Sequence, residues 1–270
     1  MNLSAGFIEK ILSSVNALRE KKPLIHCISN YVTAGDTANI LLGAGASPVM
    51  ADCPAEVAEI TAAADALLIN LGTISESRLS AMLIAGKAAN EKNIPVILDP
   101  VGAGASAFRR EAIERLFSEV KISAVRGNLS EISVIAGFSA GEQGVDTGIS
   151  SVSAEEAAIA AARKRGCICA ATGKYDIVSD GSKTFRLENG TEMLSKITGA
   201  GCMTSALCAA YSAASDPFSG TILGVAAMGI CGELSAEKCS GAGSFRTGIF
   251  DEISKLTAKT AAERIRIYEA

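Results

Sequence analysis

Short apolar runs alternate with amphipathic stretches through the first two thirds of the chain. Six runs are apolar on both faces and bounded by turn-forming residues; they fall at 23–29, 47–51, 66–72, 95–100, 122–128 and 167–173. Stretches with helical periodicity lie between them, at 35–45, 54–64, 76–93 and 154–166. Strands that are apolar on both faces and separated by helices are typical of a parallel sheet covered on both sides. The pattern therefore predicts a three-layer α/β/α fold with a mostly parallel central sheet.

The segment 174–190 departs from this pattern. Its apolar residues alternate with polar ones on both sides of Asp180-Gly181, a dipeptide that favours a two-residue turn. We expect a hairpin at the edge of the sheet here, and a chain that is almost all helix from there to its end. No internal repeat, low-complexity segment or linker interrupts the 270 residues. A single domain over residues 1–270 is the resulting prediction.

Composition narrows the class of protein. The formal net charge is -4 and the basic residues are scattered, so no stripe for nucleic acid is visible. The first fifteen residues lack a secretory signal pattern, and the apolar run 221–232 is shorter than the roughly 20 residues that span a bilayer. Eight cysteines without a CxxC pair, and a single histidine, disfavour a zinc site. We expect a cytoplasmic protein that contacts neither membrane nor nucleic acid.

Polar residues and glycines gather where the predicted strands end. In open parallel sheets ligands bind outside the carboxyl ends of the strands. The residues at these ends are Asn30 and Tyr31, Met50 and Asp52, Asn70 and Gly72, Asp99, Arg126 and Asn128, and Thr172 and Gly173. A carboxylate, a guanidinium, hydroxyls and glycines on one edge are suited to bind phosphate.

The stretch TGAGC, Thr198 to Cys202, places bare backbone in front of an apolar helix. A helix N-terminus offers free N–H groups and a partial positive charge, and glycines let a phosphate approach them. The same position is expected to lower the pKa of the Cys202 thiol. The alternative is a glycine turn that starts an ordinary core helix.

Other candidates each have a structural alternative. Asp99 is a candidate magnesium ligand or a turn cap. Glu131 is either a second carboxylate at that metal or, with Asn128 three residues earlier, half of a helix capping box. Arg126 suits phosphate oxygens, and Thr172 could offer a hydroxyl to a nucleotide. Met50 is either core packing or an apolar wall for a flat ligand.

Two further features are interpreted structurally. His26 lies inside a predicted strand, which favours a hydrogen-bonded core imidazole. Gly102, Gly104 and Ala107 match a dinucleotide-binding spacing only weakly, because the motif falls in mid-chain. The chain contains no Walker A motif and no protein-kinase signature, so any phosphate site uses another scaffold.

Taken together, these segments resemble the hydroxyethylthiazole kinases of the ribokinase-like superfamily. The resemblance rests on ISNYVT, SPVMAD, NLGT, ILDPVGAGAS, RGNLSEI, ATGKYD, TGAGCMTSAL and GAGSFRTGIFDEI, which follow one another in the family's order from residue 28 to residue 253. It implies a ribokinase-like fold and ATP-dependent phosphorylation of a thiazole alcohol, with Mg²⁺ as cofactor. Many superfamily members place an aspartate base after the glycine pair, whereas this chain has Cys202, as do the thiazole kinases.

The resemblance also implies residue roles. Cys202 would be catalytic, Gly199 and Met50 would contact the thiazole alcohol, Arg126 and Thr172 would bind ATP, and Asp99 and Glu131 would organise magnesium. The resemblance further implies a homotrimer whose sites lie between subunits. In such a trimer Asn30, Val32 and Gly72 would reach a neighbour's substrate. Two other functions stay open: a related kinase for another alcohol, such as a pyrimidine, and a non-catalytic sensor of nucleotide or thiazole.

Overall fold

The six apolar runs form the parallel part of one sheet. The computed structural model describes residues 5–138 and 152–270 of the chain. Its parallel strands are β1 (Leu24–Ile28), β2 (Ser47–Val49), β3 (Ala66–Asn70), β4 (Val96–Asp99), β5 (Ala124–Asn128) and β6 (Ile168–Thr172). Their order in the sheet is β2-β1-β3-β4-β5-β6. The predicted parallel sheet is confirmed.

The antiparallel part of the sheet contains one strand more than predicted. β7 (Asp176–Ser179) and β8 (Thr184–Leu187) form the predicted hairpin beside β6. A further strand, β9 (Ile267–Glu269), pairs with β8 and becomes the outer strand. Apart from β9, the regular elements after residue 190 are helices, as expected. A three-residue strand shows no period of its own, and its pairing with β8 stabilises it.

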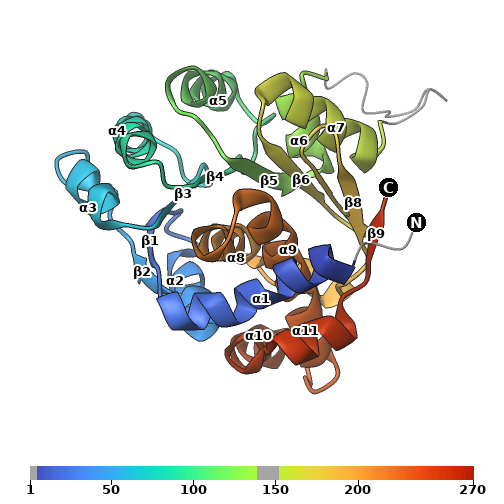
Figure 1. Cartoon of the computed structure of the whole chain (residues 1–270). Helices are drawn as coiled ribbons and strands as arrows, with labels where there is room; N and C mark the ends of the chain where they lie inside the picture. The colour runs from blue at the N-terminus through green and yellow to red at the C-terminus, as the bar shows by residue number, and fades with distance from the viewer. Residues whose placement is uncertain (1–4, 139–151) are drawn as a thin grey trace.

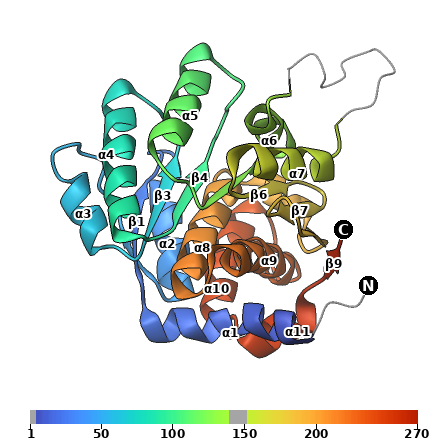
Figure 2. The same ribbon diagram turned by 45° about the horizontal axis from the view of Figure 1, so that its top comes forward.

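Helices cover both faces of the sheet, as Figures 1 and 2 show. One face carries α1 (Ala5–Lys21), α2 (Ala34–Ala44), α8 (Ala200–Ala214), α9 (Pro217–Ala236), α10 (Ala242–Lys255) and α11 (Ala258–Arg264). The other carries α3 (Val57–Ala63), α4 (Glu76–Lys92), α5 (Ala107–Glu119), α6 (Leu129–Ala136) and α7 (Ala154–Arg165). Strand residues alternate between the two cores: Leu68 packs in the first, Leu67 and Ile69 in the second.

Helix α9 is the longest helix among the described residues. It extends the apolar run 221–232 to 20 residues with a mean hydropathy of 1.3, so by length and composition it could cross a membrane. However, 83% of that apolar window is buried inside the structure, against α8 and α10. It is a buried core helix of the fold.

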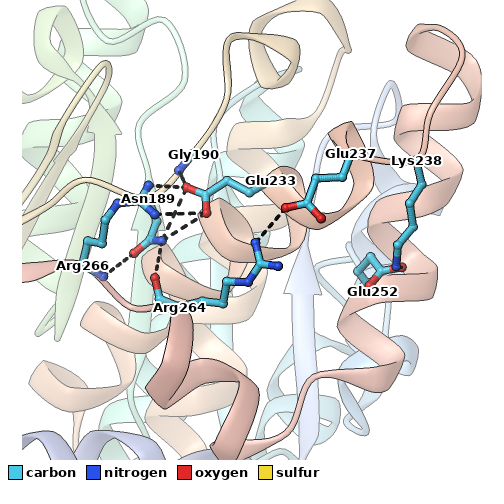
Figure 3. Close-up of polar contacts among 8 residues, drawn as sticks. All are labelled: Asn189, Gly190, Glu233, Glu237, Lys238, Glu252, Arg264 and Arg266. Atoms are coloured by element: carbon cyan, nitrogen blue, oxygen red, sulfur yellow. Dashed lines mark hydrogen bonds and ion pairs between the residues drawn. The ribbon is translucent and has the colours of Figure 1, made fainter.

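The loop that leads from β8 towards α8 is hydrogen-bonded to residues near the C-terminus (Figure 3). The Asn189 side chain donates to Arg264 O at 2.9 Å and accepts from Arg266 N at 2.8 Å. Gly190 N donates to Glu233 Oε1 at 2.7 Å, and the Arg266 guanidinium pairs with the same carboxylate. These contacts join α9, α11 and β9 to the loop after β8, which continues through the short helix η2 (Glu192–Lys196) to α8.

The direction of winding reverses between β1 and β3. From β1 the chain moves through α2 to β2 on one side, then returns through α3 to β3 on the other. Ligands of open α/β sheets bind outside the strand ends at such a switch point. The residues that follow β1 and end β3 are therefore the first place to look for a site.

Candidate active site

Two asparagines at the switch point hold the thiol of Cys202. Asn30 follows β1 and Asn70 ends β3, and both are buried. Asn30 Nδ2 lies 3.3 Å from Cys202 Sγ, and Asn70 Nδ2 lies 3.2 Å from it. Asn30 Nδ2 also donates to Asn70 Oδ1 at 3.0 Å. Cys202 is in the first turn of α8, so this contact brings the helix start to the predicted ligand edge.

Asp99 ends β4 as the register partner of Asn70 on β3. Its Oδ2 accepts from Asn70 Nδ2 at 3.0 Å and from Ser205 Oγ at 2.8 Å. Its Oδ1 is buried without a hydrogen-bond partner in the described part of the chain. Burial raises the pKa of Asp99 to about 6, although Arg126 opposes the rise. An orphaned, buried carboxylate oxygen is suited to a cation.

The expected lowering of the Cys202 pKa is wrong. Burial is the largest influence and raises the pKa of the thiol, and the charge of Asp99 raises it further. Hydrogen bonds from Thr33, Asn70 and Asn30 act in the opposite direction without reversing the shift. Cys202 is thus a protonated thiol near neutral pH, whose sulfur accepts two amide hydrogens.

Glycine occupies two positions of TGAGC for different structural reasons. Gly199 precedes α8 with φ of 88°, a left-handed conformation that glycine adopts without strain. The next amides, those of Ala200, Gly201 and Cys202, have no acceptor within the helix, and the first helical bond runs from Met203 N to Gly199 O at 2.9 Å. The predicted helix N-terminus with free amides is confirmed.

Gly201 makes room for Arg126. A β-carbon on Gly201 would lie 3.2 Å from Arg126 Cζ and Nη2 and would overlap Nη1. The guanidinium, from the middle of β5, thus rests directly against the first turn of α8. It also contacts Thr172 Oγ1 at the end of β6. The positive charge of Arg126 therefore lies between the sheet and the first turn of α8.

Thr172 and Gly173 differ in what they can offer a nucleotide. Thr172 Oγ1 bonds to Gly127 O at 3.2 Å and to Arg126. The Gly173 amide donates to Asp176 Oδ1 at 2.9 Å and is thus already engaged. Burial raises the pKa of Asp176 to about 6. The hydroxyl of Thr172 stays a candidate for nucleotide binding, whereas the Gly173 amide would first have to leave Asp176.

Glu131 forms the capping box that its spacing predicts. Asn128 Oδ1 accepts from Glu131 N at 2.9 Å, and Glu131 Oε2 accepts from Asn128 N at 2.8 Å. Glu131 Oε1 accepts from Gly102 N at 2.9 Å, which ties α6 to the loop after β4. Its charge nevertheless acts on Asp99, whose pKa it raises.

A magnesium ion fits beside Asp99 only if the protein supplies few of its ligands. Within residues 5–138 and 152–270 no group of three or more His, Cys, Asp or Glu side chains is arranged around a common point. Magnesium keeps several waters and uses one or two carboxylates together with substrate phosphates, so such a cluster is not required. Asp99 has a free oxygen for it, whereas both carboxylate oxygens of Glu131 already accept one hydrogen bond each.

The remaining predicted substrate residues lie around the same strand ends. Gly72 N donates to Asn70 Oδ1 at 2.9 Å, and a β-carbon on Gly72 would lie 2.7 Å from Asn30 Cβ. Met50 directly follows β2 and is half-buried against the first core. Val32 is 59% exposed, whereas the polar atoms of Asn30 are engaged within its own chain.

His26 is the core histidine that its strand position predicts. It is buried, with Nδ1 2.8 Å from Thr61 Oγ1 and Nε2 2.9 Å from Ala51 O. Burial lowers its pKa, so it stays neutral.

The roles of Asn70 and Ser205 were not predicted from the sequence. Asn70 stands out there only as a polar residue at a strand end. Ser205 lies three residues after Cys202, a spacing that puts both side chains on the same face of α8.

Comparisons with known proteins show which sequences and folds this chain resembles. A sequence model of the hydroxyethylthiazole kinase family matches residues 15–259. The hydroxyethylthiazole kinase of Clostridium beijerinckii is 48% identical over 268 residues, covering 96% of this chain and 97% of that protein. The solved hydroxyethylthiazole kinase of Pyrococcus horikoshii OT3 superposes with a TM-score of 0.89 at 35% identity, over 97% of this chain and 99% of that one.

More distant structures support the fold alone. A ribokinase-like superfamily protein of Enterococcus faecalis matches 96% of this chain with a TM-score of 0.63 at 11% identity. The three-layer α/β/α fold is thus ribokinase-like. By family match, by identity over nearly its full length and by fold, the chain belongs to the hydroxyethylthiazole kinase family.

Proposed function

We propose that the chain transfers the γ-phosphoryl group of ATP to the hydroxyl of 4-methyl-5-(2-hydroxyethyl)thiazole, a step of thiamine salvage. The observation that carries this is the position of Cys202. Its thiol is held by Asn30 and Asn70 at the switch point of the sheet, beside Asp99 and in the first turn of α8. An alcohol at that thiol has free helix amides on one side and a carboxylate on the other.

The amides of Ala200, Gly201 and Cys202 would hold the oxygens of the phosphoryl group in transfer. Phosphoryl transfer passes through a loose transition state in which charge sits on those oxygens, so positioning and charge stabilisation supply most of the acceleration. One helix N-terminus contributes only about 0.3–2 kcal/mol towards an anion. Arg126, packed against Gly201, supplies the additional positive charge.

Cys202 would orient the alcohol rather than remove its proton early. Its raised pKa leaves few thiolates near neutral pH. A loose transition state requires little base assistance, because the attacking oxygen forms its bond late. The two amide donors on Sγ fix the sulfur, so the substrate hydroxyl meets it in a defined place.

Asp99 would hold magnesium through its free Oδ1, with Glu131 adding negative charge nearby. Bound magnesium would neutralise phosphate oxygens of ATP. Thr172 and Arg126 would bind the nucleotide, Gly199 would face the substrate hydroxyl, and Met50 would contact the thiazole ring.

A homotrimer with sites between subunits is also part of the proposal. Tyr31 and Val32 directly follow Asn30 and are 77% and 59% exposed. Adjacent exposed apolar side chains at the rim of a site are typical of surfaces that a partner covers. We infer that Val32, with the Gly72 loop, reaches a neighbour's substrate. All eight cysteines are free, as in proteins of a reducing compartment such as the cytoplasm.

The decisive experiment is an ADP-release assay with the hydroxyethylthiazole as acceptor, with product mass measured by mass spectrometry. We expect one phosphate ester per ADP, with turnover lost when EDTA removes magnesium. A pyrimidine alcohol is the comparison acceptor. Tight thiazole binding without ADP release, or faster turnover of the pyrimidine, would refute the proposal. Light scattering tests the trimer, and a monomer would refute it.

A further inference from the structure

A buried carboxylate lies behind the start of α8. Asp36 is in the first turn of α2, and its side chain is only 5% exposed. Its partner is Arg246 of α10, whose Nε donates to Oδ2 at 2.9 Å while Nη2 contacts Oδ1. The Arg246 side chain is 49% exposed, so the cation reaches solvent while the carboxylate does not.

The carboxylate is next to the residue that begins the phosphate-binding turn. A β-carbon on Gly199 would lie 3.6 Å from Asp36 Oδ2. Gly199 precedes the helix whose free amides attract an anion. An uncompensated negative charge at this distance would oppose that attraction, and in a partly desolvated site such repulsion is strong.

We propose that Arg246 is a positioning residue for phosphoryl transfer: by neutralising Asp36 it keeps the first turn of α8 attractive to the transferred group. The inference rests on the proposed function, because it assumes that this turn receives the γ-phosphoryl group. The fork of two contacts fixes the guanidinium on Asp36, so Arg246 acts through the carboxylate and not by touching ATP.

The main rival explanation is mechanical. The pair joins α10 to α2 and could serve only as a brace. The two explanations predict different results when both partners are changed. A brace is broken equally by Arg246→Gln and by the double variant Asp36→Asn/Arg246→Gln. Neutralisation predicts that Arg246→Gln is harmful because it leaves a buried charge, and that the double variant recovers because the charge is gone.

The experiment measures kcat and KM for ATP in the thiazole-dependent ADP-release assay, together with Tm. We expect Arg246→Gln to lower kcat/KM for ATP at least about tenfold, and added Asp36→Asn to restore most of that loss. Arg246→Lys keeps the positive charge and is expected to lose less than the Gln variant. Arg264→Gln is the control, because Arg264 pairs at 2.8 Å with the exposed carboxylate of Glu237 (Figure 3), so its loss leaves no buried charge. Equal losses in Arg246→Gln and the double variant, or a Lys variant as impaired as the Gln variant, would overturn the inference.

A binding measurement separates this inference from the proposed function. Calorimetry compares AMP-PCP, which carries a γ-phosphoryl group, with ADP, which does not. We expect the preference for AMP-PCP over ADP to fall in Arg246→Gln and to return in the double variant, even if the wild-type protein does not phosphorylate the thiazole. An unchanged preference in Arg246→Gln would overturn the inference while leaving the thiazole assay to decide the function.

Discussion

Replacing Gly201 by alanine tests the contact between the Arg126 guanidinium and the start of α8. The new β-carbon would overlap Arg126 Nη1 and lie 3.2 Å from Cζ. Carbon atoms in ordinary contact are about 3.5–4.0 Å apart, so the guanidinium would have to move by about 1 Å. The helix backbone cannot yield as easily, because it is fixed by its own hydrogen bonds and by the packing of α8 on α9.

The substitution should separate activity from stability. Alanine favours a helix over glycine by up to about 1 kcal/mol, which offsets the cost of moving a half-buried side chain. We therefore expect the free energy of unfolding to change by less than about 1 kcal/mol. A misplacement of 1 Å at a reacting group costs up to about a hundredfold in rate, or about 2.7 kcal/mol of barrier.

The assay is ADP release with varied ATP, and urea unfolding measures stability. Gly6→Ala in α1 is the control, because no atom lies within 4 Å of its new β-carbon. We expect the control to keep wild-type turnover and Gly201→Ala to lose at least about tenfold in kcat/KM for ATP. If Gly201→Ala stays within about twofold of wild type, the close approach of Arg126 has no catalytic importance and the reasoning fails.

Three other substitutions test the remaining assignments. In magnesium-free protein the folded-state pKa of Asp99, about 6, exceeds its ordinary 3.8, so wild-type stability should fall as pH rises from about 4 to 6, by up to about 3 kcal/mol (2.2 × 1.36). Asp99→Asn should remove this fall and be the more stable protein in urea at pH 7.5, yet inactive; a less stable variant there would contradict the burial argument. Cys202→Ser should keep measurable turnover, losing less than the hundredfold expected for a lost general base, and complete inactivity with intact ATP binding would refute the orienting role. Arg126→Ala should weaken ATP use far more than thiazole binding measured by calorimetry, and unchanged ATP kinetics would remove Arg126 from the nucleotide site.

The sheet could be predicted because its signal is local. Runs such as 66–72 are short, apolar on both faces and bounded by turn-forming residues, which is typical of a strand covered by helices on both sides. The strand β9 could not be predicted, since the alternation of three residues carries almost no information. What stabilises it is β8, a partner far away in the sequence.

The edge of the sheet at which the site lies was predictable, but the hydrogen bonds that connect its residues were not. Strand ends placed Asn70 and Asp99 on one side of the sheet, whereas the register that makes them direct partners depends on how the helices pack. The direction of the Cys202 pKa shift was likewise not predictable from the sequence. The sequence displays the helix N-terminus, which lowers a thiol pKa, but it does not display the burial and the Asp99 charge that outweigh it.

Asn70 shows why an amide suits the centre of this site. Its Nδ2 donates to Asp99 Oδ2 and Cys202 Sγ, and its Oδ1 accepts from Asn30 Nδ2 and from the Gly72 amide. An aspartate of the same shape could donate to neither Asp99 nor the sulfur, and it would put a second negative charge beside a carboxyl that burial already disfavours as an anion. A leucine would remove one of the two donors to Asp99 Oδ2, leaving only Ser205, and would leave the Gly72 amide without its acceptor. One uncharged side chain that both donates and accepts thus sets the positions of the candidate metal ligand, the thiol and the substrate loop at the same point of the sheet.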